Sequence, residues 1–268
     1  MHINIFLLAF LFVLLFFGYM RFEASWIQIN KIRFCNDSKC LKIMHLSDIH
    51  IRFLCVPIKK IVEVIKNENP DIIFITGDFI TSKNDVPAFL SFIDKINFLC
   101  PIMFTVGNHE YKSFKQNLKD LERFIYDIKQ KGCILLDNES LLFEKDSNNY
   151  NIIGIGEKKY NLHDVNKALS NINSNFTKIA FTHNPDLILD LKGYNLDYLF
   201  CGHFHGGQIW MPFGLEFKFF RKESLCKMGI TRGLHKINGI NLYINRGLGN
   251  VLFPFRFLSR PEISIYYL

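Results

Sequence analysis

The chain has 268 residues and a formal net charge of +7, and 49% of its residues are hydrophobic. This apolar fraction excludes a disordered protein, and beyond a short N-terminal segment the remaining length suits one large domain. The positive charge favours an acidic partner, such as a phosphorylated ligand or an anionic membrane surface. No run of Lys and Arg is long enough to form a nucleic-acid-binding arm, so we expect no nucleic-acid partner.

The chain begins with an apolar segment, and no charged side chain occurs before Arg21. Its length approaches that needed to cross about 30 Å of bilayer hydrocarbon. We therefore expect residues 1–24 to form a membrane anchor and residues 25–268 to form the folded domain. A cleaved signal peptide is the alternative, but it would have a basic start and a small-residue cleavage site. Basic residues follow the segment, so the positive-inside rule predicts a single-pass protein with a cytoplasmic domain.

The cysteines are scattered along the chain without a CxxC pair. The seven of them are Cys35, Cys40, Cys55, Cys100, Cys133, Cys201 and Cys226. Their odd number favours a reducing compartment, so we expect free thiols. Cys35 and Cys40 are close enough in the sequence to close a small loop if the domain is exported.

Five short apolar runs each end in polar residues that can bind a metal ion. The runs cover residues 41–46, 72–76, 102–106, 178–182 and 196–201. Such runs predict strands that are buried on both faces. Helical patterns occur at 57–67, 86–96, 114–131, 162–172 and 185–191, and further strands are expected at 151–154, 242–245 and 263–267. This alternation predicts an α/β domain in which helices cover the sheets.

The residues that directly follow these five runs are candidate metal ligands. They are Asp48, His50, Asp78, Asn108, His183, His203 and His205. Taken singly, each has an ordinary explanation as a helix cap, a turn residue or a core histidine. Ligands in α/β sheets, however, bind beyond the carboxyl ends of the strands, where all these residues are expected. Together they predict a site for two divalent metal ions.

Carboxylate, amide and imidazole ligands suit manganese, with iron and zinc as alternatives. Two such cations, about 3.5–4 Å apart, clamp a phosphoryl group and activate water. The leaving oxygen then needs a proton, and we predict that His109, next to Asn108, is the catalytic acid. Glu110 is a candidate partner for the other ring nitrogen of His109.

These motifs, in this order, resemble those of the calcineurin-like metallophosphoesterases. The motifs are Asp48-Ile-His50, Gly77-Asp78, Gly107-Asn108-His109-Glu110, His183 and Gly202-His203-Phe-His205. The resemblance covers residues 42–268 and implies a four-layer αββα sandwich. It also implies that Asp78 bridges two metal ions, the first bound with Asp48, His50 and His205 and the second with Asn108, His183 and His203. The family often has Asp at the position of Glu110.

Segments 182–186, 206–209, 245–249 and 260–263, with the apolar N-terminus, are similar to a membrane-anchored bacterial subgroup. That subgroup includes UDP-2,3-diacylglucosamine pyrophosphatases of lipid A biosynthesis, which release UMP and the acylated glucosamine 1-phosphate. This similarity implies a bacterial inner-membrane protein with an amphiphilic phosphorylated substrate. Segments 210–222 and 251–260 mix aromatic and basic residues, which is typical of a rim that contacts membrane lipids or, equally, of core flanked by surface charge.

Three other functions are consistent with part of this pattern. A broad-specificity membrane-associated phosphodiesterase, acting on nucleotides or cell-envelope phosphates, would share every motif. A phosphoprotein phosphatase is disfavoured because no protein-docking module is evident, and we expect no protein partner. A non-enzymatic scaffold would have lost ligands or the acid, and all of them are present.

Overall fold

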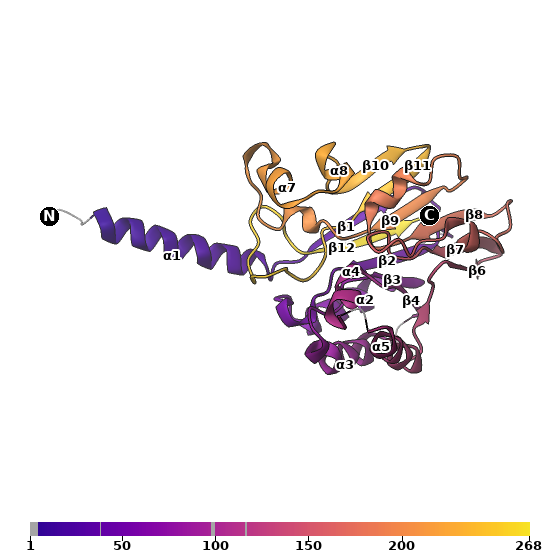
Figure 1. Ribbon diagram of the computed structural model, residues 1–268, viewed down its shortest axis with the longest axis horizontal. Coiled ribbons are helices and arrows are strands. Elements are labelled where there is room, and N and C mark those ends of the chain that lie inside the picture. Colours follow the sequence, from indigo (N-terminus) through magenta and orange to yellow (C-terminus); the bar gives the residue numbers. More distant parts are fainter. Residues whose placement is uncertain (1–4, 38, 98–99, 116) are drawn as a thin grey trace.

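The computed structural model describes residues 5–37, 39–97, 100–115 and 117–268 (Figure 1). The first four residues of the expected anchor, and Gln116 within an expected helix, lie outside the described residues. Helix α1 (Ile5–Glu23) projects away from a domain that contains every other labelled element. Two six-stranded sheets form the centre of that domain.

The first sheet carries the N-terminal half of the expected metal site. Its strand order is β1-β12-β2-β3-β4-β5. The strands are β1 (Gln28–Arg33), β2 (Lys42–Ser47), β3 (Ile72–Thr76), β4 (Ile102–Thr105), β5 (Ile134–Leu135) and β12 (Glu262–Tyr267). Strands β2 to β5 are parallel, whereas β12 runs antiparallel to β2. The carboxyl ends of β2, β3 and β4 therefore meet at one edge of the sheet.

The second sheet carries the C-terminal half of the expected metal site. Its strand order is β10-β11-β9-β8-β7-β6. Its strands are β6 (Glu139–Lys145), β7 (Asn148–Gly154), β8 (Thr177–Phe181), β9 (Tyr198–Cys201), β10 (Gly233–Ile237) and β11 (Ile240–Ile244). Strands β7, β8, β9 and β11 are parallel. Buried side chains such as Phe74, Phe181 and Phe200 pack between the two sheets.

Helices cover the outer face of each sheet, which confirms the predicted four-layer αββα sandwich. The first sheet packs against α2 (Ile58–Glu68), α3 (Val86–Ile96) and α5 (Leu118–Gln130) through one buried apolar cluster. The second packs against shorter elements, and a separate apolar cluster lies there. These elements are α6 (Val165–Ala168), η3 (Pro185–Leu189), α7 (Leu215–Phe220) and α8 (Ser224–Lys227).

Three expected helices have different bounds in the structure. The helix expected at 114–131 begins only at Leu118, as α5, because Lys115 adopts a left-handed conformation (φ 50°) between it and the preceding short helix α4 (Asn108–Ser113). Only α6 forms within 162–172, and residues 185–189 form the 3₁₀ helix η3. The remaining short 3₁₀ elements are η1 (Ile51–Phe53), η2 (Lys83–Asp85), η4 (His205–Gly207) and η5 (Pro212–Gly214).

Helix α1 is long and apolar enough to cross a membrane, with a mean hydropathy of 2.3. Only 6% of its most apolar window is buried, so its surface is not covered by the domain. A membrane anchor and a signal sequence both fit these properties. Its last turn is packed into the domain, where the backbone of Arg256 donates a hydrogen bond to the carbonyl of Met20 at 3.1 Å. The buried carboxylate of Glu23 accepts one from the backbone of Ser259 at 2.8 Å.

The prediction that all cysteines are free thiols is wrong for one pair. Cys35 and Cys40, in the turn between β1 and β2, form a disulfide bond. An odd cysteine count does not exclude a single short-range pair, and the turn brings the two thiols together. The five other cysteines are free.

Candidate metal centre

The candidate ligands lie on loops at the carboxyl ends of β2, β3, β4, β8 and β9, as the sequence predicts. Most of these loops have an unusual backbone. Asp48, His50, Asp78, His203 and His205 all have positive φ angles, between 37° and 75°. This conformation is rare for residues other than glycine and is costly, so surrounding contacts must hold it. Gly202 permits one such close contact, because a Cβ atom there would lie 1.7 Å from Oγ of Ser47.

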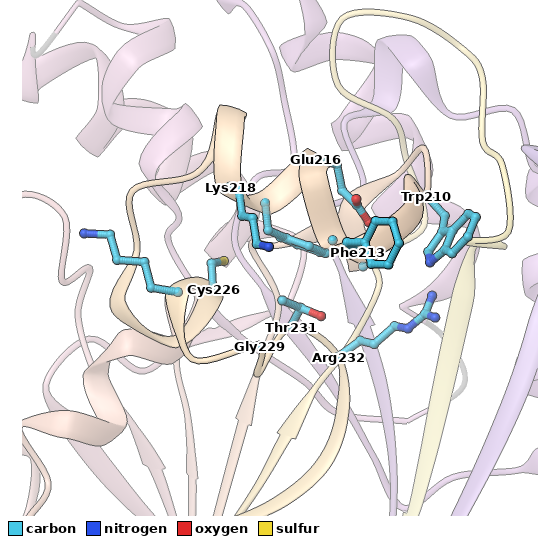
Figure 2. A pocket seen from close by; sticks show the side chains of 12 residues that line it. Trp210, Phe213, Glu216, Lys218, Cys226, Gly229, Thr231 and Arg232 are labelled. Atoms are coloured by element: carbon cyan, nitrogen blue, oxygen red, sulfur yellow. The ribbon is translucent and has the colours of Figure 1, made fainter.

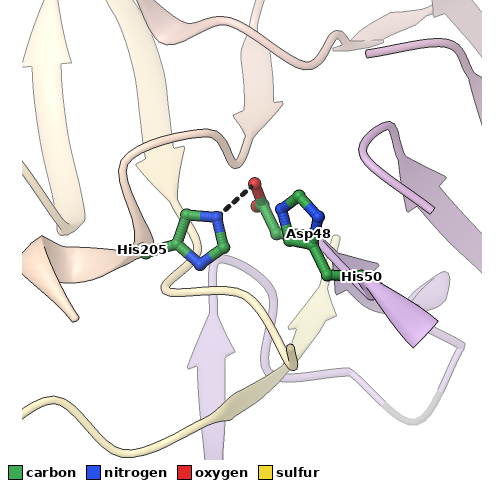
Figure 3. A group of neighbouring side chains, drawn as sticks. All are labelled: Asp48, His50 and His205. Atoms are coloured by element: carbon green, nitrogen blue, oxygen red, sulfur yellow. Dashed lines mark ion pairs between the residues drawn. The ribbon is translucent and has the colours of Figure 1, made fainter. Parts of the chain in front are cut away.

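Asp48, His50 and His205 form the first cluster (Figure 3). Their candidate ligand atoms all lie within 4.8 Å of one another, and all three residues are buried. Nε2 of His205 lies 3.2 Å from a carboxylate oxygen of Asp48. The rings of His50 and His205 are stacked, with centroids 5.1 Å apart. The two loops that carry these residues therefore aim their donor atoms at one point.

Asp78, His183 and His203 form the second cluster. Nε2 of His183 lies 3.2 Å from Oδ2 of Asp78 and 3.0 Å from Nδ1 of His203. The same Oδ2 atom of Asp78 is 3.7 Å from Nε2 of His50, which belongs to the first cluster. Asp78 thus lies within reach of ligands in both clusters, which fits a bridging ligand.

The donor atoms fit two divalent cations. Nε2 of His50 and Oδ1 of Asn108 are buried without a hydrogen-bond partner among the described residues. Buried polar atoms are rarely left unpaired, and a bound cation would satisfy both of them. The carboxylate, amide and imidazole donors also match the preferences of Mn, Fe or Zn, without selecting one of them.

The electrostatics of the clusters favour metal binding. Burial lowers the pKa of His50 to about 3 and that of His203 to about 4, so both imidazoles are neutral and able to bind a metal. Burial opposes ionisation of Asp78, but the neighbouring His183, His109 and His50 together outweigh it and hold the pKa of Asp78 well below its usual range. Asp78 in turn raises the pKa of His183 against the effect of burial, so a cation bound there must displace a proton.

The expected pairing of Glu110 with His109 is wrong. The carboxylate of Glu110 is fully buried and accepts hydrogen bonds from four backbone amides. They belong to Asp78, Phe79, Ile80 and Gly107, at 2.7–3.2 Å. Glu110 therefore ties the loop after β3 to the loop after β4. Nδ1 of His109 is buried without a hydrogen-bond partner among the described residues, and its ring stands edge-on to His50 at 4.7 Å.

A cavity of about 590 Å³ opens onto the metal clusters. Asp78, Asn108, His109, His203 and His205 line its floor, so the structure brings the predicted acid and the predicted ligands together. Two basic residues, Lys159 and Arg221, also line it. Arg221 belongs to segment 210–222, which the sequence marks by its mix of aromatic and basic residues, whereas no motif marks Lys159. Their positions depend on how the loops around residue 159 and after α7 fold back over the site.

Glu223 is a second residue that the sequence did not reveal. Its carboxylate oxygen Oε1 lies 3.0 Å from Nε2 of His203, on the side of the ring away from His183. Arg221 donates a hydrogen bond to the carbonyl of His203 at 2.9 Å and lies 3.5 Å from the same oxygen of Glu223. A carboxylate on the outer nitrogen of a metal-binding histidine fixes the ring orientation and tautomer.

Comparison with known proteins gives the family. The family model described as calcineurin-like phosphoesterase matches residues 41–207, which contain every candidate ligand. The chain belongs to this family. It is therefore a metal-dependent phosphoester hydrolase, and the family predicted from the motifs is confirmed.

Several relatives span most of the chain. The uncharacterized metallophosphoesterase YkoQ of Bacillus subtilis is 33% identical over 231 residues, covering 85% of this chain and 83% of YkoQ. UDP-2,3-diacylglucosamine pyrophosphatase LpxG of Chlamydia trachomatis is 28% identical and covers 84% and 82% of the two chains. Phosphodiesterase YaeI of Escherichia coli is 25% identical, covering 93% and 91%.

Among solved structures, the phosphopantetheinyl hydrolase PptH of Mycobacterium tuberculosis superposes with a TM-score of 0.51. The superposition covers 78% of this chain and 89% of that structure, at 10% sequence identity. Similarity at this identity supports the shared fold alone.

Proposed function

We propose that this chain hydrolyses a phosphoester or pyrophosphate bond in an amphiphilic substrate held at a membrane surface. One observation carries the proposal: the cavity over the metal clusters has an exposed apolar wall. Phe220, Leu252 and Phe253 line the cavity, yet their side chains are 75%, 72% and 61% exposed. Large exposed apolar patches of this kind mark membrane or ligand contacts.

The apolar wall lies at the end of the domain where α1 leaves it. In Figure 1 the yellow loops around residues 250–258 lie next to the point at which α1 meets the domain, and helix α7 lies at the same end. Phe16 and Phe17 of α1 contact Phe257 and Phe255 through their rings, with centroids 5.2 and 5.5 Å apart. A bilayer around α1 would therefore meet the wall of the cavity.

The same loop joins α1 to the metal centre. Ser259 donates its backbone hydrogen to Glu23 and its hydroxyl to the carbonyl of His205 at 3.0 Å. This connection favours residues 1–24 as an uncleaved anchor and residues 25–268 as the catalytic domain. An anchor packed in this way holds the cavity at a fixed height above the bilayer.

The chemistry follows from the residues that line the cavity. The seven candidate ligands would hold two cations, manganese being favoured, which polarise a phosphoryl group and activate water. Lys159 and Arg221 would bind the remaining phosphate oxygens. His109 would donate a proton to the leaving oxygen.

The first candidate substrate is UDP-2,3-diacylglucosamine. Water adds to one phosphorus, the bond from that phosphorus to the bridging oxygen breaks, and UMP and the acylated glucosamine 1-phosphate leave. The apolar wall would contact the acyl chains, and the relative LpxG is named for this activity. Such a role belongs to lipid A biosynthesis in a bacterial inner membrane, and it requires the cytoplasmic domain that the charges after α1 favour.

The second candidate is a broad-specificity membrane-associated phosphodiesterase that acts on nucleotides or cell-envelope phosphates. The Cys35–Cys40 disulfide favours it, because disulfides persist in oxidising compartments outside the cytoplasm. The relative YaeI is named a phosphodiesterase. Outside the cytoplasm, a UDP-linked biosynthetic intermediate is not the expected substrate.

The test is a comparison of substrates under Mn²⁺. Full-length protein in phospholipid vesicles is given UDP-2,3-diacylglucosamine, a soluble aryl phosphodiester, a cyclic nucleotide and a phosphopeptide, and initial rates are measured. The first candidate predicts the highest kcat/KM for the acylated substrate. Preference for the soluble phosphodiester would replace it with the second candidate, and preference for the phosphopeptide would contradict both.

A further inference from the structure

A second pocket, of about 220 Å³, lies beside the metal cavity and shares Glu216 and Phe217 of α7 with it (Figure 2). None of the candidate ligands lines this pocket, and neither does His109. Its remaining walls come from the segment before α7, from α8 and from the turn that leads into β10. It is therefore separate from the proposed catalytic machinery.

The pocket has an excess of positive charge. Lys218, Lys227 and Arg232 line it, and none of these three forms an ion pair with another described residue. The one acid in its lining, Glu216, is buried and accepts a hydrogen bond from the backbone of Met211 at 3.1 Å. Figure 2 shows Lys218 on one side of the pocket and Arg232 beside Trp210 on the other. These charges suit a phosphate group.

The edge of the pocket carries an exposed aromatic residue in a strained conformation. Phe213 has a φ of 60° and its side chain is 87% exposed. A bulky residue rarely adopts this conformation, and strain of this kind concentrates at functional sites. Leu252 and Leu258 share both properties, with φ angles of 65° and 51° and exposures of 72% and 50%. Three bulky apolar side chains are thus held outward at energetic cost.

The location of the pocket favours a lipid as the source of the phosphate. Helix α7 lies at the end of the domain where α1 emerges (Figure 1). Aromatic and apolar side chains insert at the level of lipid headgroups, while Lys and Arg contact the phosphates. Residues 208–232 also lie beyond the segment that the family model matches, so this pocket is built by a part of the chain outside the shared motifs.

We propose that the pocket between α7, α8 and the 229–232 turn binds the phosphate of an anionic lipid headgroup. Phe213 inserts beside it into the bilayer. The catalytic domain is then docked on the membrane at two places, through α1 and through this pocket. The proposal does not depend on which substrate the metal centre hydrolyses.

Trp210 lines the pocket and can report on this docking. The chain has two tryptophans, so Trp26→Phe leaves Trp210 as the sole fluorophore. The full-length variant is reconstituted into vesicles of brominated phosphatidylcholine, with or without about one third phosphatidylglycerol. We expect bromine to quench Trp210 more strongly when the anionic lipid is present, because docking brings the pocket to the headgroups.

Variants of the pocket cations test the contact itself. Lys218→Ala and Arg232→Ala should each lower the ratio of docked to undocked protein about fivefold, the usual effect of one basic residue near an anionic bilayer. Lys129→Ala on the exposed face of α5 is the matched control and should have no effect. Hydrolysis of a soluble phosphodiester should be unchanged in all three variants, which shows that they are folded and that the metal centre is intact.

Three results would overturn the proposal. Equal quenching in neutral and anionic vesicles would mean that headgroup charge is not recognised. Equal behaviour of Lys218→Ala, Arg232→Ala and Lys129→Ala would remove the pocket as the contact. If inorganic phosphate binds to the protein but phosphatidylglycerol vesicles do not compete with it, the pocket binds free phosphate rather than a headgroup. None of these results bears on the substrate rates that test the proposed function.

Discussion

The carboxylate of Glu223 lies 3.0 Å from Nε2 of His203, while Nδ1 of the same ring lies 3.0 Å from His183 in the second cluster. The two nitrogens thus have separate roles, one toward the proposed metal and one toward the carboxylate. Because Glu223 lies in the short connection between α7 and α8, the helix that contributes to both cavities is tied to the metal centre.

Replacement of Glu223 tests this relationship. Glu223→Ala should lower metal affinity about 10–100-fold at one of two sites, the usual cost of losing such an outer carboxylate. Glu223→Gln keeps an oxygen for the Nε2 hydrogen and should lose less. Chelator competition with two-step Mn²⁺ binding measures this, with Glu122→Ala on the exposed face of α5 as the control. Equal affinities in all variants would show that Glu223 does not position His203.

The metal content of two variants distinguishes the proposed acid, His109, from the proposed bridging ligand, Asp78. His109→Ala should keep metal near the unmodified level while kcat falls roughly 10²–10⁴-fold, the usual scale for a general acid. Asp78→Ala should lose both metals, because its carboxylate is within reach of both clusters. Elemental analysis of the two purified proteins decides the matter. Equal metal loss would make His109 a ligand rather than the acid.

Glu110 should matter for the structure of the site rather than for proton transfer. Its four amide hydrogen bonds join the loop that carries Asp78 to the loop that carries Asn108. Glu110→Ala leaves these buried donors unpaired, at about 1–3 kcal/mol for each group that water cannot reach. We expect a lower Tm and weaker metal binding together. Glu110→Asp, the residue common in the family, should restore much of both, and a stable, metal-loaded Glu110→Ala protein would contradict this role.

The side of the membrane distinguishes the two proposed functions. The basic residues after α1 lead us to expect a cytoplasmic domain, so an impermeant maleimide applied to intact cells should not label Lys129→Cys. Labelling should appear only after lysis. The redox state of Cys35 and Cys40 gives an independent readout, because alkylation under non-reducing conditions marks them only if they are thiols in the cell. Labelling of Lys129→Cys before lysis, together with resistance of Cys35 and Cys40 to alkylation, would favour the broad-specificity phosphodiesterase outside the cytoplasm.

Much of the site could be predicted because its motifs directly follow strands. Buried runs such as Ile72–Thr76 are recognisable from composition, and their carboxyl ends meet at one edge of a parallel sheet. The four edge strands, β1, β5, β6 and β10, are not predicted because their residues are all exposed or half-buried, so that their composition resembles that of a loop.

Partners far apart in the sequence could not be predicted. Glu223 reaches His203 only because α7 and α8 fold back over the second sheet. For Glu110, proximity in the sequence suggested a contact with His109 that does not form. In the first turn of α4 the carboxylate of Glu110 accepts hydrogen bonds from backbone amides instead. The composition of segment 210–222 fits both a membrane-contacting rim and a buried core, and the structure contains both: Phe217 is buried, whereas Phe219 and Phe220 are exposed.

The last turn of α1 has to stay in place when the apolar anchor is removed. Met20 and Glu23 are buried against the catalytic domain, so a deletion of residues 1–21 would disrupt the packing of that domain. Removal of residues 1–15 deletes most of the exposed apolar segment and keeps these contacts. Metal content and Tm should stay close to those of the full chain.

The most direct test of the account compares two substrates before and after loss of the two exposed aromatic side chains of α7, Phe219 and Phe220. Phe219→Ser with Phe220→Ser is introduced into the chain that lacks residues 1–15, and Phe217 is left intact because it is core. We predict that hydrolysis of an acylated substrate in bilayers falls at least tenfold, since two exposed aromatic side chains no longer insert. Hydrolysis of a soluble phosphodiester should stay within about twofold, because it arrives from bulk water. Parallel losses on both substrates, or unchanged activity in bilayers, would contradict the proposal that this hydrolase takes its substrate from the membrane.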